Sequence, residues 1–322
     1  MNAELQTGVD YTRLHYRGRI SQIGIYLGKL IRMFVYQSDW KVLPMAALIA
    51  GLVTFAVGAN LYKTQEGTLQ GSFALVCVCI WNGFFNSIQV ICRERPIIKR
   101  EHRAGMHITS YIAAHMIYQM ILCILQTSIM LAVCMLMKLK LPYEGLVTPW
   151  FLTDLFITLF LITYSADMLS LAISALVRNT TTAMTVMPFV LIFQLLFSGG
   201  LVVLTGTALK LTDFTIAKWG LKGLCTLGNY NARPMVALWN TIFKFRDLEL
   251  LGYKPIGMIM DEIQNRDMLD EVLLASGQYN QNAAYVYTAE NLTGCWIRLI
   301  GIGALFAVIS VVLLEFVDRD RR

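Results

Sequence analysis

The chain has 322 residues, of which 56% are apolar and 15% charged, and its mean hydropathy is +0.56. This composition excludes an ordinary soluble domain of that size and indicates a polytopic membrane protein. The net charge is +6 and the pI is near 8.9. In a membrane protein this basic charge indicates attraction to anionic lipid head groups rather than nucleic-acid binding.

The N-terminal region is predicted to be a short tail followed by a surface helix. Residues 1–19 are polar, contain no signal-peptide core and are expected to form a cytoplasmic tail. From Ile20 onward, apolar residues recur at intervals of three and four up to Phe34, with Lys29 and Arg32 on the flank. This spacing predicts an amphipathic helix over 20–37 that lies on the inner membrane surface.

The rest of the chain, residues 20–322, is expected to form one transmembrane permease domain with an all-α fold. Runs of about 20 apolar residues are long enough to cross the hydrocarbon as helices. Six such spans are predicted, at 43–62, 72–92, 111–137, 151–177, 183–205 and 295–317.

The distribution of Lys and Arg predicts the orientation of these spans. Fifteen lie in the N-terminal tail, the 93–107 and 178–182 loops and the C-terminal tail, whereas the short loops on the other side hold three: Lys63, Lys138 and Lys140. Because retained positive charge marks the cytoplasmic side, both termini are predicted to be cytoplasmic.

A dense charged stretch, RERPIIKREHRAGM at 93–106, separates the second and third spans. Pro96 suits a first helical turn, Glu94 would lie near the positive N-terminal end, and Gly105 would end the helix. Lys99, Arg100 and Arg103 would then lie toward the C-terminal end, where cations are favoured, and Glu94 and Glu101 would be able to pair with the surface helix, for instance with Arg32, or with a partner. The alternative is a solvated loop that only satisfies the charge rule.

Several polar side chains lie inside predicted spans. Asn82, Asn86 and Gln89 share one face of the second span, where they would line a substrate path or form interhelical hydrogen bonds. Asp167 lies within the fourth span, on a face with Tyr164, Ser170 and Ser174, and is either a functional carboxylate or a buried structural one. Pro188 predicts a local kink in the fifth span.

Residues 206–293 form a large predicted outer segment with eight basic and nine acidic side chains. Its semi-apolar part, from Trp219 to Trp239, is a candidate for re-entry into the outer leaflet. Cys225 and Cys295 are the two cysteines predicted on the outer side, where a disulfide between them is conceivable.

Sequence motifs for common enzyme chemistry are absent. The chain has no Gly-x-x-x-x-Gly-Lys-Ser/Thr phosphate loop, no His-Glu-x-x-His and no Gly-x-Ser-x-Gly. His102 and His107 lie in a basic stretch that disfavours a cation, so we expect neither a metal site nor a catalytic residue.

Four stretches, in order, carry a family resemblance. They are RERPIIKREHRAGM with the following ITSY (93–106 and 108–111), LAISALVRN (171–179), LFSGGLV (196–202) and NARPMVAL (231–238). Together they resemble the permease half of G-subfamily ATP-binding cassette (ABC) exporters, a type-2 group, over about residues 20–317.

The resemblance implies a dimer of six-helix units with a connecting helix at about 20–37 and a re-entrant outer segment. It implies a coupling helix within 94–105, comprising Glu94, Arg95, Pro96, Lys99, Arg100 and Glu101, that docks on an ATP-binding subunit. It also implies a substrate cavity at the dimer axis, for which the candidate residues are Asn82, Asn86, Ile192, Leu195 and Leu201. Where a multidrug member closes this cavity with two leucines, this sequence has Gly200 and Leu201, which departs from that pattern.

We therefore expect the permease subunit of an exporter in the plasma membrane. It would bind no cofactor itself, and a separate ATP-binding subunit would bind ATP and magnesium; Met1 favours a separate polypeptide over a longer fused product. The expected cargo is amphipathic or lipid-like. Other expected partners are a second permease copy, in a homo- or heterodimer, and membrane lipids. Two other classes stay open: a membrane-embedded enzyme acting on lipid head groups, and a nonenzymatic scaffold.

Overall fold

The computed structural model describes residues 18–36, 39–139, 141–200, 206–249 and 252–315. Within these ranges the regular structure is helical, apart from an isolated bridge between Glu144 and Trp150. The α-helices are α1 (Arg19–Tyr36), α2 (Val42–Val57), α3 (Gln65–Ser87), α4 (Val90–Arg103), α5 (Ile108–Leu136), α6 (Phe151–Leu176), α7 (Thr180–Leu196), α8 (Thr207–Thr212), α9 (Ile216–Leu227), α10 (Ala237–Phe243), α11 (Pro255–Asn265), α12 (Leu269–Tyr279) and α13 (Ala289–Glu315).

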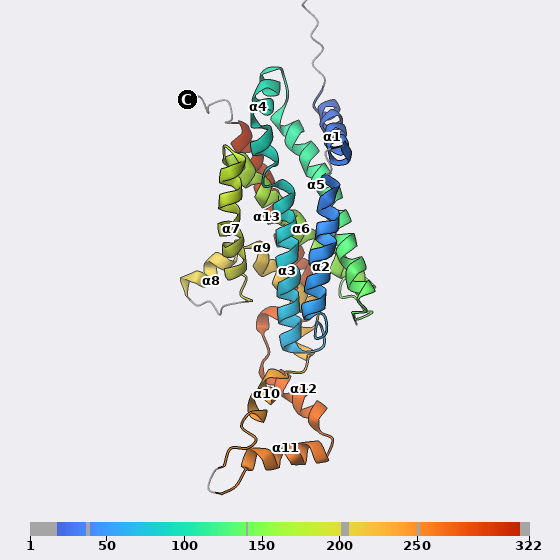
Figure 1. The fold of residues 1–322 in the computed structure, drawn as a ribbon, viewed down its shortest axis with the longest axis vertical. Coiled ribbons are helices and arrows are strands. Elements are labelled where there is room, and N and C mark those ends of the chain that lie inside the picture. The colour runs from blue at the N-terminus through green and yellow to red at the C-terminus, as the bar shows by residue number, and fades with distance from the viewer. Residues whose placement is uncertain (1–17, 37–38, 140, 201–205, 250–251, 316–322) are drawn as a thin grey trace, which may run out of the picture.

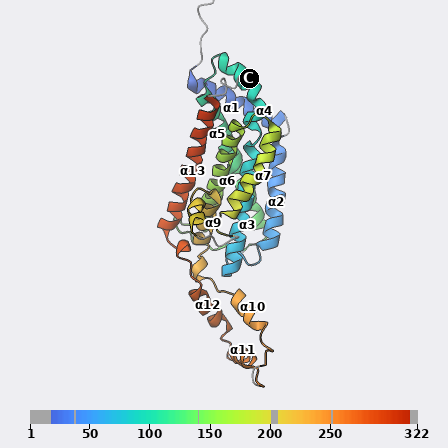
Figure 2. The same ribbon diagram turned by 90° about the vertical axis from the view of Figure 1, so that its left-hand side faces the viewer.

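The bundle is built around α6, which packs against α3, α5, α9 and α13 (Figures 1 and 2). Leu159, Ile162 and Ala166 of this helix are fully buried. Small residues bring the neighbouring helices close, since a Cβ added at Gly83 of α3 would lie 2.4 Å from the carbonyl oxygen of Thr163. The central packing is therefore set by close backbone approach as well as by apolar side chains.

A helix lies within each of the six predicted spans, although α2 ends at Val57 rather than at 62 and α13 begins at Ala289 rather than at 295. Four of the described helical stretches are long and apolar enough to cross a membrane. These are the continuous stretch Gln65–Arg103, which comprises α3 and α4, together with α5, α6 and α13. The apolar helices α2 and α7 have 16 and 17 residues, which corresponds to about 25 Å of helix. The chain is therefore an all-α polytopic membrane protein.

The predicted boundaries of the second and fifth spans need correction. The second was placed at 72–92, but α3 begins at Gln65, where Thr64 caps it by accepting a 3.0 Å hydrogen bond from the amide of Gly67, and it ends at Ser87. The fifth was placed at 183–205, but α7 runs from Thr180 to Leu196. It stops early because a turn follows, in which Gly199 adopts a φ of 80°.

The predicted outer segment divides into an inserted helix and a projecting part. Ten of the twelve residues of α9 are buried among the bundle helices, so the semi-apolar stretch does pack within the bundle, over a shorter range than 219–239. The helices α10, α11 and α12 project beyond the bundle at the end opposite α4 (Figures 1 and 2).

The N-terminal turn of α3 anchors this projection. Glu66 accepts hydrogen bonds from the amides of Ala237, at 2.7 Å, and Val236, at 3.3 Å, at the start of α10. Buried Gln65 donates to the carbonyl oxygen of Gly277, at 2.9 Å. The projection is therefore attached to the spanning helix α3 by hydrogen bonds, in addition to its covalent connections to the bundle.

Cys225 and Cys295 are both buried free thiols, on the adjacent helices α9 and α13. The disulfide considered from the sequence is thus not formed in the structure.

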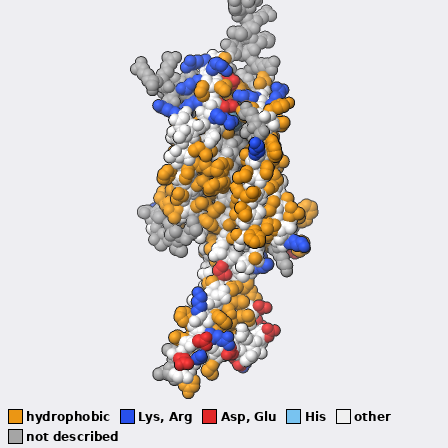
Figure 3. Space-filling model, in the orientation of Figure 1, with side chains coloured by type: hydrophobic (Ala, Val, Ile, Leu, Met, Phe, Trp, Pro, Cys, Tyr) orange, Lys and Arg blue, Asp and Glu red, His pale blue; other side chains and the backbone are white. Residues whose placement is uncertain are grey.

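Side-chain chemistry divides the described surface into zones. Apolar side chains cover the side of the bundle, and Lys and Arg gather at the end where α1 and α4 lie (Figure 3). The start of α1 and the end of α13 also lie at this end (Figures 1 and 2). We call it the basic end.

Candidate functional site

The charged stretch at the basic end forms the helix α4, whose two ends are fixed by different means. At its N-terminus the hydroxyl oxygen of Ser174, from α6, accepts hydrogen bonds from the amides of Ile91, at 3.1 Å, and Cys92, at 3.2 Å. At its C-terminus Gly105 adopts a φ of 100°, and the amide of Met106 donates to the carbonyl oxygen of Glu101 at 3.0 Å. The predicted stop at Gly105 is confirmed.

The predicted start of this helix is wrong. Because α4 begins at Val90, Pro96 is its seventh residue and lies in the interior, and Glu94 lies in the second turn rather than beside the N-terminal dipole. Pro96 removes one backbone donor from the helix, so its place there depends on contacts with neighbouring helices.

Glu94 connects α4 to the surface helix and to α5. It is 6% exposed, receives a hydrogen bond from the hydroxyl of Tyr111 at 3.0 Å, and forms an ion pair with Lys29 of α1 at 3.4 Å. The prediction that a glutamate of this stretch pairs with a cation of the surface helix is confirmed, but the cation is Lys29 instead of Arg32.

Glu101 makes a second contact with α1. It accepts a 2.8 Å hydrogen bond from the hydroxyl of Tyr26. Burial, followed by the hydrogen bond and charge of Glu101, raises the pKa of the Tyr26 phenol, so this group stays a donor at neutral pH. Gln22 adds a third link, since it donates to the carbonyl oxygen of Gly105 and accepts from the amide of His107. The predicted amphipathic helix thus exists as α1 and braces α4.

Arg95 connects α4 to the end of α6. Its guanidinium donates to the carbonyl oxygens of Ala175 and Val177, which belong to the last turn and the cap of α6. A cation is favourable there because these carbonyls lack partners within the helix and carry the negative end of its dipole.

The other face of α4 is exposed. Pro96, Ile97, Arg100 and Arg103 recur at helical spacing and lie at the surface of the basic end. Lys99 lies half-buried beside them. We call Pro96, Ile97, Arg100 and Arg103 the basic stripe.

The structure does not gather the predicted cavity residues into one pocket. Ile192 of α7 is 61% exposed, whereas Asn82 of α3 is 7% exposed. Leu195 is half-buried, and Leu201 lies outside the described residues. Asn86 exchanges two 2.9 Å hydrogen bonds with Gln126 of α5, so its amide serves interhelical bonding. A cavity at a dimer axis would need a second copy, and the assignment stays a prediction.

Asp167 is fully buried and joins three helices. It accepts hydrogen bonds from the hydroxyl of Ser87 in α3 and from the thiol of Cys123 in α5. These contacts support the structural interpretation of this carboxylate. Among the described residues, no group of three or more His, Cys, Asp or Glu side chains is placed to hold a metal ion.

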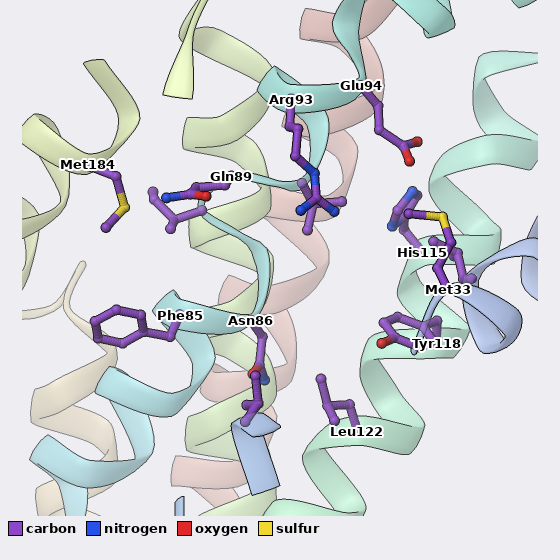
Figure 4. A pocket seen from close by; sticks show the side chains of 14 residues that line it. Met33, Phe85, Asn86, Gln89, Arg93, Glu94, His115, Tyr118, Leu122 and Met184 are labelled. Atoms are coloured by element: carbon purple, nitrogen blue, oxygen red, sulfur yellow. The ribbon is translucent and has the colours of Figure 1, made fainter. Parts of the chain in front are cut away.

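Sequence reasoning did not identify a cavity of about 300 Å³ between α1, α2, the junction of α3 and α4, α5 and α7 (Figure 4). Gln89, Arg93 and His115 contribute to its polar lining. In the sequence, most of the charged stretch lies between Arg93 and His115. No short-range spacing therefore indicates that the two side chains line the same cavity.

An apolar belt, a braced amphipathic helix and a charged helix at one end of the bundle define a polytopic membrane protein with a basic surface at one end. Residues 30–209, more than half of the chain, match the family of ABC-2 type transporters, and the chain belongs to that family. It is a permease of the ABC transporter class.

One relative is an ABC transporter ATP-binding/permease protein of Mycobacterium tuberculosis. It is 27% identical to this chain over 146 residues, which cover 44% of the chain and 16% of the relative. The chain thus matches only a small part of that protein's length.

Proposed function

We propose that this chain is the permease subunit of an ABC exporter in the plasma membrane. It moves an amphipathic or lipid-like substrate, and a separate ATP-binding subunit, docked on α4, binds ATP and magnesium and hydrolyses the ATP. The observation that carries the proposal is the basic stripe on a helix whose opposite face is fixed to three other helices.

The bracing of α4 suits it to transmit movement. A partner shifts a conformational equilibrium only through contacts that differ between the two states. Force applied to the basic stripe passes to α1 through Glu94 and Glu101, and to α6 through Arg95. Because α4 follows α3 directly, the same movement reaches a spanning helix.

The proposed topology has six spans with both termini in the cytoplasm. The helices α2 and α7 supply the two shorter spans, and outward apolar side chains support this role: Leu52 and Phe55 of α2 are 63% and 80% exposed. The basic end then faces the cytoplasm, and α10 to α12 lie outside, in accordance with the charge distribution.

The proposed active form is a dimer of permeases. Trp81 and Phe85 of α3 and Phe189 and Ile192 of α7 are exposed aromatic or aliphatic side chains. They offer an apolar surface to a second copy and to a substrate between the copies, and Leu195 of α7 belongs to the same proposed cavity.

The alternative of a lipid head-group enzyme finds no support in Asp154 and Asp167. Asp154 accepts three backbone hydrogen bonds, from Leu146, Val147 and Thr148 at 2.7 to 3.0 Å, and so holds the loop before α6. Asp167 is engaged with Ser87 and Cys123. Both carboxylates have structural partners.

The test is a charge reversal in the basic stripe. The permease is co-expressed with the candidate ATP-binding subunit, and co-purification, ATPase activity and transport are measured. Arg100→Glu should weaken subunit association by about tenfold and reduce transport, because it reverses a charge of the basic stripe at the proposed docking surface. The matched control is Lys244→Glu, on the exposed surface after α10, which should leave all three readouts unchanged.

Equal association and transport in both variants, at equal membrane levels, would remove the docking role from α4.

A further inference from the structure

The cavity between α1, α2, α3, α4, α5 and α7 is lined by one buried polar side chain, His115, that has no hydrogen-bond partner among the described residues. His115 of α5 is 1% exposed, and neither of its ring nitrogens has a hydrogen-bond partner among the described residues. The imidazole lines the cavity (Figure 4). Burying an unpaired donor and acceptor is costly, which favours a polar group of a ligand inside the cavity.

The charges around the cavity favour an anion. Arg93 of α4 extends its guanidinium into it (Figure 4). Glu94 also lines the cavity, but its carboxylate is bound by Lys29 at 3.4 Å and by the hydroxyl of Tyr111 at 3.0 Å. The remaining charge at this wall is therefore positive, and guanidinium is well suited to phosphate and carboxylate groups.

Apolar side chains complete the lining of the cavity. Met33 of α1 lies beside His115, and Phe85 of α3 and Met184 of α7 form an apolar wall on the side away from it (Figure 4). Leu30 and Met33 of the amphipathic helix α1 line the cavity, and α1 lies at the basic end beside the bundle (Figure 1). The site thus combines anion-binding groups with an apolar wall, beside the amphipathic helix α1 at the basic end.

We propose that this cavity binds the anionic head group of a phospholipid from the leaflet that surrounds α1, with Arg93 as the ion-pair partner and His115 as a hydrogen-bonding partner. A volume of about 300 Å³ equals roughly ten water molecules. This space holds a phosphoglycerol head group but not two acyl chains, which extend along the apolar wall into the bilayer. The site does not depend on ATP or on a second permease copy.

Binding can be measured on the permease alone. The purified, delipidated protein is titrated with phosphatidylglycerol or phosphatidylcholine of identical acyl chains, and bound lipid is counted by native mass spectrometry. The wild type should prefer phosphatidylglycerol. Arg93→Gln should weaken its binding by about tenfold, the loss of one charge-assisted hydrogen bond.

The matched control is Arg32→Gln, which removes a cation from the exposed side of α1, next to Met33 in sequence. It should bind phosphatidylglycerol like the wild type. If Arg93→Gln weakens binding no more than Arg32→Gln does, the attraction is general surface charge and the site is refuted.

Two substitutions test the imidazole. His115→Phe keeps an aromatic ring without hydrogen-bonding groups and should lose the preference for phosphatidylglycerol, whereas His115→Gln keeps a donor and an acceptor and should retain most of it. If His115→Phe does not fold, His115→Leu, which also lacks hydrogen-bonding groups, is measured in its place, and loss of the preference in that variant supports the role of the ring nitrogens. Wild-type binding in a folded His115→Phe variant refutes the assignment.

Soluble glycerol phosphate separates a lipid site from a phosphate site. At the concentration at which phosphatidylglycerol saturates the protein, it should fail to displace the lipid, because it lacks the chains that contact Met33 and Phe85. Equal competition would show that the cavity binds free phosphate esters, which would overturn the lipid proposal.

Discussion

A row of three polar side chains on α6 holds the junction between α3 and α4. Asp167 bonds to Ser87, the hydroxyl of Ser170 donates to the carbonyl oxygen of Phe84 at 2.9 Å, and Ser174 receives the first amides of α4. Positions 167, 170 and 174 share one helix face. Ser174 thus satisfies the first amides of α4, which lack helical partners, while Asp167 and Ser170 bind the end of α3 on the other side of the break.

Replacing Ser174 tests this row. Ser174→Ala removes the acceptor for two amides of α4, so it should lower the free energy of unfolding by about 1 to 2 kcal/mol. Thermal unfolding of the purified protein in detergent measures the change. Ser128→Ala is the matched control, since its hydroxyl donates to the carbonyl oxygen of Ile124 in its own helix, in an exposed position.

The control should change stability by less than about 0.5 kcal/mol. If the two variants unfold at the same temperature, Ser174 does not cap α4.

At this scale the sequence placed Asp167, Ser170 and Ser174 on one face but did not predict their partners. The reason is distance along the chain, since Ser174 lies more than 80 residues after the amides that it receives. Likewise, Asn82 and Asn86 were grouped by spacing, but only the fold shows that Asn86 pairs with Gln126.

At the scale of elements, the sequence predicted those helix features that depend only on residues close together in the chain. The periodicity of α1 and the glycine that ends α4 were visible in the sequence, because a surface stripe and a left-handed backbone position each depend on neighbouring residues. The start of α4 was missed because its cap comes from α6, and the end of the fifth span was missed because apolar residues continue past the Gly199 turn.

The packing of α3 on α6 offers an element-scale test at Gly83. A Cβ there would lie 2.4 Å from the carbonyl oxygen of Thr163 and 2.9 Å from the Cβ of Ala166, so Gly83→Ala must push the helices apart. We expect it to destabilise the protein by about 1 to 3 kcal/mol in thermal unfolding.

Gly51→Ala in α2 is the control for helix propensity. The nearest atom to its added Cβ is 3.9 Å away, in ordinary contact, so stability should stay equal or rise slightly. A Gly83→Ala protein as stable as this control would contradict the close approach of α3 and α6.

For the whole molecule, the sequence predicted a polytopic helical fold and its charge asymmetry. It did not predict that α10 to α12 project as a unit tied to Gln65 and Glu66, because those contacts join positions about 170 to 212 residues apart. Composition indicated that 206–293 has balanced charge and a semi-apolar part at its start, and gave no contacts for the polar remainder.

The orientation of the whole molecule is open to a direct test. Ala104, at the end of α4, and Gln264, in α11, are both exposed and lie at opposite ends of the molecule (Figure 1). The native thiols give a low background, since six of the seven cysteines are buried and Cys77 is half-buried in α3.

A membrane-impermeant maleimide should label Gln264→Cys in intact cells. It should label Ala104→Cys only after permeabilisation, because the fifteen cations on that side favour retention in the cytoplasm. Labelling in denaturant confirms that both variants are present. The reverse pattern would invert the topology, and labelling of both sites in intact cells would contradict an odd number of spans between positions 104 and 264.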